Sequence, residues 1–369
     1  MNSELKYQIA LSLLSNIGDV LAKTLLAYCG STEEIFKQRK SALLKIPGIG
    51  NVSALTILNH KVFDRAEEEI AFIKKNNISP LFFLDENYPA RLKHCADSPV
   101  MLYFKGNQNL NAQKILSIVG TRQPTNYGKR ICNKLVEDLA VLFPDMLIVS
   151  GLAYGIDFCA HKAAMENNLN TLAILGHGLD RIYPSLHAAL AEKMLDNGGW
   201  LSEFTSLTKP DFMNFPKRNR IIAGIADATV VVESKREGGS LITADIANSY
   251  SRDVFAFPGR VDDFCSEGCN YLIKINKAAL ALSAKDIVYI MGWEEKKKEK
   301  KAPVQKSLFL EMSPEESLLI DTIKEKGSVS IDDLSLATKI KMSKVSALLL
   351  NLEFSGMVKS LPGKLYVLN

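Results

Sequence analysis

The sequence has little of what marks membrane, secreted or metal-dependent proteins. Although 47% of its 369 residues are hydrophobic, no stretch approaches the ~20 apolar residues that a membrane span needs. Met1–Leu14 has neither a basic start nor a small-residue cleavage site, so we expect no signal peptide. Its six cysteines are scattered, which predicts reduced thiols and a cytoplasmic protein. Cys265 and Cys269 have neither a second pair nor a nearby histidine, so no metal site is expected.

The chain also lacks an excess of charge of one sign. Lys and Arg number 45 against 41 Asp and Glu, which leaves a net charge of +4, and no predicted domain is strongly basic. Any binding of an anion must therefore depend on local clusters of cations and on backbone N–H groups. No Gly-x-Gly-x-x-Gly follows the first core strand, so we expect no dinucleotide cofactor.

Residues 1–80 read as short helices with two hairpin-like turns, Leu14–Gly18 and Ile46–Gly50. A Pro-Gly-Ile-Gly turn that enters a helix is typical of a helix-hairpin-helix unit, in which backbone amides approach a DNA phosphate. A packed helical bundle that merely keeps this turn geometry explains the pattern equally well. Both interpretations stay open at this point.

Residues 81–292 carry a strand and helix alternation that predicts an α/β fold. Residues 81–113 look extended, and from residue 114 apolar strands alternate with helical patterns, as in a Rossmann-like, doubly wound, mostly parallel sheet. Ligands of such sheets bind beyond the carboxyl ends of the strands. The expected strands are Leu81–Leu84, Val100–Phe104, Ile115–Val119, Met146–Val149, Thr171–Leu175, Trp200–Ser202, Ala228–Val232 and Asp253–Phe257.

The remaining residues divide into a linker and a small domain. Residues 293–312 are rich in Lys and Glu, which predicts a solvated linker. Residues 313–369 begin with Ser313-Pro314, a good helix start, and continue as three helices and a terminal hairpin with a Pro362-Gly363 turn, as in a winged helix. Its expected recognition helix, Ser343–Phe354, is nearly neutral and therefore suits a protein partner better than the major groove.

Glycine-rich or basic loops follow the core strands. Residues 120–125 and 150–157 combine glycines with helix starts that suit a phosphate, with Thr125 or Asn126 expected as a cap. His177, in the loop 176–181, lacks a paired nucleophile, so we interpret it as a loop side chain. In the loop 233–244, Gly238 and Gly239 give the backbone freedom, and Ser240 is a candidate cap. Pro258-Gly259 follows the last expected strand.

The least ordinary loop is Phe215–Gly224, which places Lys217, Arg218 and Arg220 at the start of an apolar helix. Cations at a helix start oppose the helix dipole, which is unfavourable unless an anion lies there. Because basic residues come from several loops at one sheet edge, we expect a pocket for several phosphates of a polymer.

The ordered series VGTRQPTNYG, SGLAYGID, ILGHGLDRIYP, FPKRNRIIAG, GGSLITA and FAFPG resembles the DNA-processing protein A (DprA, or Smf) family. The resemblance covers about residues 81–292. It implies a cytosolic homodimer that binds incoming single-stranded DNA in natural transformation and loads the RecA recombinase. One departure is Glu237, which stands where a cation is often found.

By this match Arg122, Arg218 and Arg220 are the expected phosphate contacts, with Asn219 orienting its loop. The full expected DNA-binding set is Gly120, Thr121, Arg122, Ser150, Gly151, Gly155, Lys217, Arg218, Asn219, Arg220, Gly239, Ser240 and Thr243.

Two other functions compete with DNA binding. A Rossmann-like enzyme that cleaves nucleotide glycosidic bonds would need a placed glutamate, and Glu203 or Glu233 could take that role. The Gly-rich loop matches such enzymes only in part, and no second acid or base is evident, so we expect no enzyme. A pure protein adaptor would not need the clustered cations of residues 217–220.

Overall fold

The computed structural model describes residues 2–293, 313–361 and 365–368, which fall into two compact units divided at residues 296 and 297. Nearly all of the expected linker, residues 294–312, and the expected Pro362-Gly363 turn lie outside the described residues. Within the described ranges, no helix is both long enough and apolar enough to cross a membrane.

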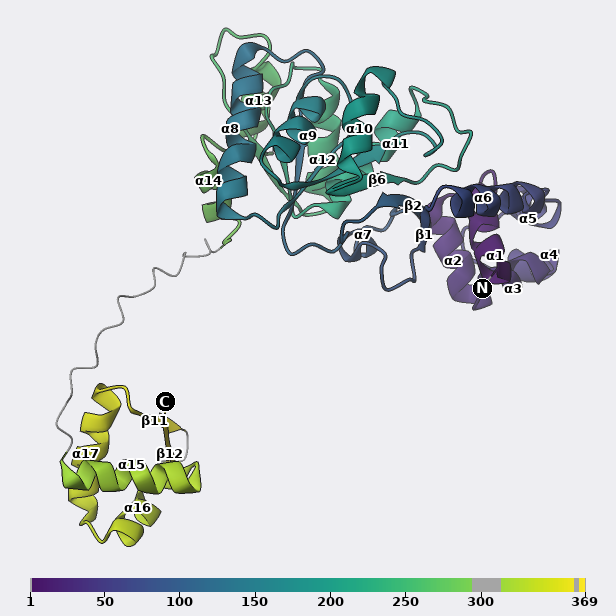
Figure 1. Ribbon diagram of the computed structural model, residues 1–369. Coiled ribbons are helices and arrows are strands. Elements are labelled where there is room, and N and C mark those ends of the chain that lie inside the picture. Colours follow the sequence, from purple (N-terminus) through teal and green to yellow (C-terminus); the bar gives the residue numbers. More distant parts are fainter. Residues whose placement is uncertain (1, 294–312, 362–364, 369) are drawn as a thin grey trace. The chain divides into compact units, whose positions relative to one another are not determined.

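The first unit begins with short helices, as expected (Figure 1). The Leu14–Gly18 turn joins the first two helices, with Asn16 at φ 60°, and the Ile46–Gly50 turn joins the fourth and fifth, with Gly48 at φ 81°. Their apolar faces share one core with the first sheet strands. The helices are α1 (Asn2–Leu13), α2 (Asp19–Cys29), α3 (Thr32–Lys37), α4 (Lys40–Leu43), α5 (Asn51–Leu58) and α6 (Phe63–Lys75).

A nine-stranded sheet forms the centre of this unit, in the order β1-β2-β6-β5-β4-β3-β7-β8-β9. The pairs β1–β2 and β2–β6 are antiparallel and all the others are parallel. The strands are β1 (Ser79–Phe82), β2 (Met101–Gly106), β3 (Ile115–Val119), β4 (Leu147–Ser150), β5 (Asn170–Leu175), β6 (Gly198–Ser202), β7 (Ala228–Val231), β8 (Asp253–Ala256) and β9 (Ala279–Leu280). The predicted mostly parallel sheet is confirmed. The expectation that the strand at residue 253 is the last was wrong, because the short β9 pairs beyond it.

Helices cover both faces of the sheet, because successive side chains of a buried strand point to opposite faces. Leu116 and Ile118 of β3 pack with α8, α9 and α14, while Ile115 and Val119 pack with α11, α12 and α13. The core helices are α7 (Ala90–Lys93), α8 (Asn126–Leu142), α9 (Ile156–Glu166), α10 (Ala188–Met194), α11 (Asn214–Ile225), α12 (Gly239–Ser249), α13 (Glu267–Lys274) and α14 (Ala284–Ile290).

The strand order reverses beside β3. From β3 the chain adds β4, β5 and β6 on one side, and then crosses to add β7, β8 and β9 on the other. The carboxyl ends of β3 and β7 therefore flank the topological switch point, where open α/β sheets form their ligand crevice.

The second unit is the predicted winged helix. Ser313 and Glu316 form a capping box with Pro314 at the helix start, as the sequence indicates. The short β10 adds a third strand that the sequence pattern did not predict. The elements are α15 (Pro314–Lys326), β10 (Val329–Ser330), α16 (Ile331–Thr338), α17 (Met342–Phe354), β11 (Val358–Leu361) and β12 (Leu365–Leu368).

Candidate nucleic-acid interface

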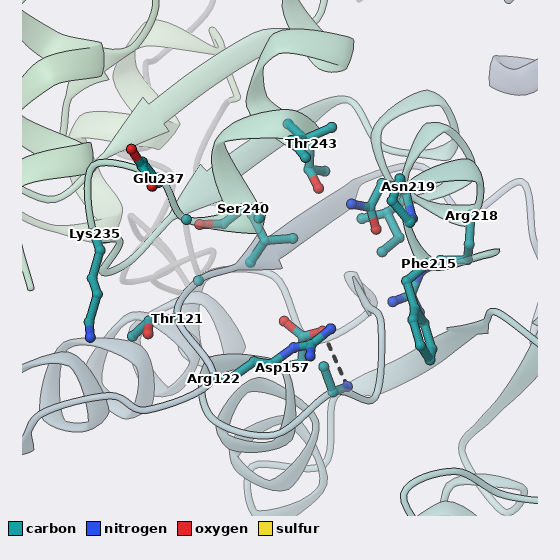
Figure 2. Close-up of a pocket in the computed structure, with 18 of the residues that line it drawn as sticks. Thr121, Arg122, Asp157, Phe215, Arg218, Asn219, Lys235, Glu237, Ser240 and Thr243 are labelled. Atoms are coloured by element: carbon teal, nitrogen blue, oxygen red, sulfur yellow. Dashed lines mark hydrogen bonds between the residues drawn. The ribbon is translucent and has the colours of Figure 1, made fainter. Parts of the chain in front are cut away.

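A cavity of about 800 Å³ lies at the switch point, within the size range of ligand sites. Figure 2 shows its wall: Thr121 and Arg122 on one side, Phe215, Arg218 and Asn219 on another, and Ser240 and Thr243 on a third. Of the expected DNA-binding set, the structure brings together here Gly120, Thr121, Arg122, Arg218, Asn219, Gly239, Ser240 and Thr243.

Glu233, which follows β7 and is 1% exposed, fixes the loop after β3 by hydrogen bonds. Its carboxylate accepts hydrogen bonds from Thr125 N at 2.8 Å and Thr125 Oγ1 at 2.6 Å, and its carbonyl oxygen accepts from Thr121 N at 2.7 Å. A side chain at Gly128 would collide with this carboxylate. Thr125 caps α8 as expected, by accepting from Gly128 N. The network presents Arg122 at the tip of the loop.

Gly155 and Gly120 let the neighbouring loop pack against this one. Gly155 has φ 84°, and a Cβ there would overlap the carbonyl oxygen of Thr121. A Cβ on Gly120 would lie 2.5 Å from the Ile156 side chain. The backbone N–H of Ile156 donates to Thr121 O at 3.1 Å. Gly155 does not line the cavity, and it acts by shaping the loop that does.

Arg218 is a buried cation in the cavity wall, with 5% exposure. Its Nη1 donates to Gly151 O at 2.6 Å and also to Ile174 O. Burial lowers the pKa of this guanidinium to about 10, and Arg122 acts in the same direction while Asp157 opposes both. Arg218 therefore stays cationic at neutral pH.

Asp157, in the first turn of α9, faces the same cavity and accepts from Ala153 N at 3.3 Å, the dashed line of Figure 2. Burial raises the pKa of this carboxyl, against the opposing influence of Arg218. Its opposite charge in the cavity wall is therefore Arg218, with which it interacts electrostatically.

The start of α12 contributes backbone amides. Its N-cap residue Gly238 provides no side-chain cap, and a Cβ on Gly239 would meet nothing within 4 Å. The expected capping by Ser240 was wrong: this side chain is buried inside the first turn, and its Oγ donates to Ser234 Oγ at 2.9 Å. An uncapped helix start open to a cavity favours an anion.

Several lining residues were missing from the expected set. Lys235 Nζ lies 4.9 Å from the centre of the Phe264 ring, and Arg236 Cζ lies 3.3 Å from the centre of the Tyr271 ring. Arg122 lies 5.8 Å from the centre of Phe215, and it forms no ion pair with any residue that the structure describes. The aromatic residues Phe212, Phe215 and Phe264 line the cavity. Phe215 stands within a motif that resembles the family, but Phe212 and Phe264 lie in irregular loops where no sequence pattern marks them.

Two of the expected phosphate contacts face away from the cavity. Arg220 is 8% exposed and pairs with Glu203 and, at 3.1 Å, with Asp19. Lys217 pairs with the same Glu203 at 3.1 Å. Consecutive helix residues are rotated by about 100°, so Arg218 and Arg220 point to opposite sides of α11. The anion expected beside the clustered cations is thus partly the internal carboxylate of Glu203, and Arg220 contacts that carboxylate and not the cavity.

Ser150 and Gly151 are also behind the cavity wall rather than in it. Ser150 is fully buried and its Oγ donates to Ile118 O at 2.6 Å. A Cβ on Gly151 would lie 2.6 Å from both terminal nitrogens of Arg218. These two residues therefore support Arg218 rather than contact a ligand directly.

Neither glutamate of the enzyme alternative lines the cavity. Glu203 is held by Lys217 and Arg220, and Glu233 by Thr125. The carboxylates that do line it are Asp157 and Glu237.

His177 is a buried loop side chain whose Nδ1 lies 2.9 Å from Gly178 O, and burial lowers its pKa. In the described residues, no group of three or more His, Cys, Asp or Glu side chains could hold a metal ion.

Comparison with known proteins identifies the family of this chain. The family model described as DNA recombination-mediator protein A matches residues 79–292, and that of the DprA winged helix domain matches residues 300–364. Protein Smf of Synechocystis is 32% identical over 411 residues, which cover 99% of each chain. DNA processing protein DprA of Streptococcus pneumoniae is 40% identical over 205 residues, covering 56% of this chain and 71% of the relative.

Solved structures give the same result. DNA processing protein A of S. pneumoniae matches with a TM-score of 0.65 at 32% identity, covering 77% of this chain and 97% of that one. DNA processing protein A of Helicobacter pylori, whose structure concerns its single-stranded DNA binding mode, matches with a TM-score of 0.52 at 28% identity. This match covers 58% of this chain and 95% of that one. The chain therefore belongs to the DNA recombination-mediator protein A family, also called DprA or Smf.

Proposed function

We propose that this protein binds single-stranded DNA in the cavity at the switch point. The observation that carries the proposal is the combination, in one cavity, of Arg122, Arg218, the open start of α12 and exposed aromatic rings. Proteins that bind single strands without sequence preference combine a cationic groove for the phosphates with aromatic platforms for the bases. Phe212, which is 81% exposed, and Phe215 suit the second role.

We further propose that the protein acts as a homodimer that protects incoming DNA in natural transformation and helps to load a RecA recombinase, without catalysing a reaction. Membership in a recombination-mediator family supports this role. A RecA ATPase assay on single strands coated with their binding protein should show faster activation when this protein is added. Light scattering should give a dimer mass, and a monomer at micromolar concentration would contradict the assembly.

The affinity for oligo-dT, measured by fluorescence anisotropy over a salt series, tests the binding site. If Arg122, Arg218, Lys235 and Arg236 each contact a phosphate, the slope of log K against log salt is about −2.8, because each contact contributes ~0.7. Arg122→Ala should weaken binding and bring the slope to about −2.1. Arg130→Ala is the matched control, since Arg130 is exposed on α8 and does not line the cavity.

Two results would count against the proposal. Equal affinities and slopes for the wild type and Arg122→Ala would show that the cavity does not hold the DNA backbone. Incubation with nucleoside monophosphates tests the enzyme alternative, and release of a free base or ribose phosphate would overturn the non-catalytic role.

A further inference from the structure

The loop 203–213 and helix α11 form one wall of the cavity and carry Phe212, Phe215, Arg218 and Asn219. Behind this wall lie the N-terminal helices, which contribute nothing to the cavity lining itself. They nevertheless reach the wall through two buried polar contacts, and DNA binding as proposed above uses neither of them.

The first contact holds the middle of the loop. Glu69 of α6 is 1% exposed, and it accepts hydrogen bonds from Ser206 N at 3.0 Å and Ser206 Oγ at 2.5 Å. Arg65, one turn earlier on α6, donates to Ser206 O at 2.6 Å and to Glu69 at 2.8 Å. The backbone donor, the backbone acceptor and the hydroxyl of Ser206 are thus all bound by one ion pair of the helical segment.

The second contact holds α11. Arg220 lies between Glu203, at the start of the loop, and Asp19, the first residue of α2. Asp19 also accepts from Val100 N at 2.9 Å, which ties α2 to the start of β2. Burial alone would lower the pKa of Arg220, but Glu203 and Asp19 raise it, so the cation remains charged. Arg218 faces the cavity from the opposite side of the same helix.

We propose that the N-terminal helices position the DNA-binding wall through these two contacts, and that Arg220, Asp19 and Glu69 are positioning residues rather than DNA contacts. The inference rests on the proposed DNA binding. The Glu69–Ser206 contact fixes the loop that carries Phe212, and the Asp19–Arg220–Glu203 contact fixes the helix that carries Arg218 and Asn219. Preorganisation of a site improves affinity because less ordering remains to be done on binding. By thermodynamic linkage, bound DNA must in turn stabilise the docked helices.

The sign of the effect separates positioning from simple electrostatics. Asp19→Asn and Glu69→Gln each remove a negative charge from the neighbourhood of a site for a polyanion, which by itself would strengthen binding. Loosening the wall weakens binding instead. Perturbations of coupled networks by 0.5–2 kcal/mol correspond to about 2- to 30-fold in affinity, so we expect a loss in that range for each variant.

The experiment measures oligo-dT affinity of the full chain over a salt series for Asp19→Asn, Glu69→Gln and Arg220→Gln. Asp227→Asn is the matched control: Asp227 pairs with Arg91 at 2.6 Å, is 22% exposed against 21% for Asp19, and accepts a strand amide, Ile115 N, at 2.8 Å. It lies just before β7, at the other end of the strand from the cavity. The three wall variants should lose affinity with an unchanged salt slope, and Asp227→Asn should bind like the wild type.

Hydrogen exchange provides a readout that requires no substitution. Oligo-dT should slow exchange of the Ser206 amide, which donates to Glu69. Affinities of Asp19→Asn and Glu69→Gln at or above the wild-type value would overturn the inference. So would a slope for Arg220→Gln shallower by ~0.7, the sign of a lost phosphate contact. If a variant fails to fold, an unchanged Ser206 exchange rate in the wild type decides against the inference. Failure of DNA binding itself would show separately, because Arg122→Ala would then also have no effect.

Discussion

Two glycines of the same site offer a sharp test of where Arg218 lies. A Cβ on Gly151 would lie 2.6 Å from both Nη atoms of Arg218 and 2.7 Å from its Cζ, whereas ordinary contact begins near 3.4 Å. The guanidinium in Gly151→Ala must therefore retreat by about 0.8 Å, the difference between these distances. A Cβ on Gly239, at the start of α12, would meet nothing within 4 Å.

The magnitudes follow from this geometry. The guanidinium is the end of a flexible side chain beside the cavity, so the shift itself costs little, but it stretches the 2.6 Å hydrogen bond from Arg218 to Gly151 O. Because a hydrogen bond that involves a charged group is worth about 1.5–3 kcal/mol, Gly151→Ala should lower the free energy of unfolding by up to this amount. If Arg218 contacts a phosphate, a displaced charged hydrogen bond worth about 1.5–3 kcal/mol should weaken oligo-dT binding at least tenfold. Gly239→Ala should leave stability unchanged or raise it by up to ~1 kcal/mol, and weaken binding only if a phosphate approaches this helix start closely.

Urea unfolding and fluorescence anisotropy of the two variants give both quantities. Wild-type stability for Gly151→Ala would refute the position of the guanidinium against this glycine. A destabilised Gly151→Ala that still binds oligo-dT normally would show that Arg218 is a structural cation rather than a DNA contact.

Two further predictions concern the winged helix and acid stability. Because α17, the recognition helix, carries one lysine and one glutamate and offers no cluster of cations, removal of residues 294–369 should leave oligo-dT affinity unchanged in gel-shift assays, and a large loss would contradict a protein-binding tail. Burial lowers the pKa of His161 from 6.5 to about 3, so below pH 6.5 the unfolded chain binds a proton that the folded chain refuses. The free energy of unfolding should then decrease as the pH is lowered below 6.5, by up to about 1.4 kcal/mol per pH unit. Urea melts of His161→Gln should show a weaker dependence on pH. An equally steep dependence in the variant would exclude His161 as the cause.

The sequence predicted the fold well, because its signals are local. Apolar strands such as Ile115–Val119 are buried on both faces, and this gives continuous apolar runs that identify a parallel sheet. Helix starts at Thr125 and Ser313 follow from side chains that bond amides three residues on. The short strands β9 and β10 were missed, since two-residue strands have no recognisable period.

The candidate site was predictable only in part. Because the carboxyl ends of parallel strands meet at one edge, the loops at Gly120 and Gly239 could be assigned to one cavity from the order of elements alone. Helical periodicity across Lys217–Arg220 could also have shown that Arg218 and Arg220 do not face the same side. That Arg220 turns inward required its partner, Asp19, which is 201 residues away in the chain.

The sequence by itself determined which segments become strands and helices and which loops bear the charge, because those properties depend on neighbours a few residues apart. The tertiary structure alone decided which cations remain free for a ligand. Arg220 is buried between Glu203 and Asp19, and Lys217 pairs with the same Glu203, whereas Arg122 stays exposed beside Phe215. Whether a cation reaches the cavity or is bound to an internal carboxylate depends on pairings between distant parts of the chain, such as Asp19 with Arg220.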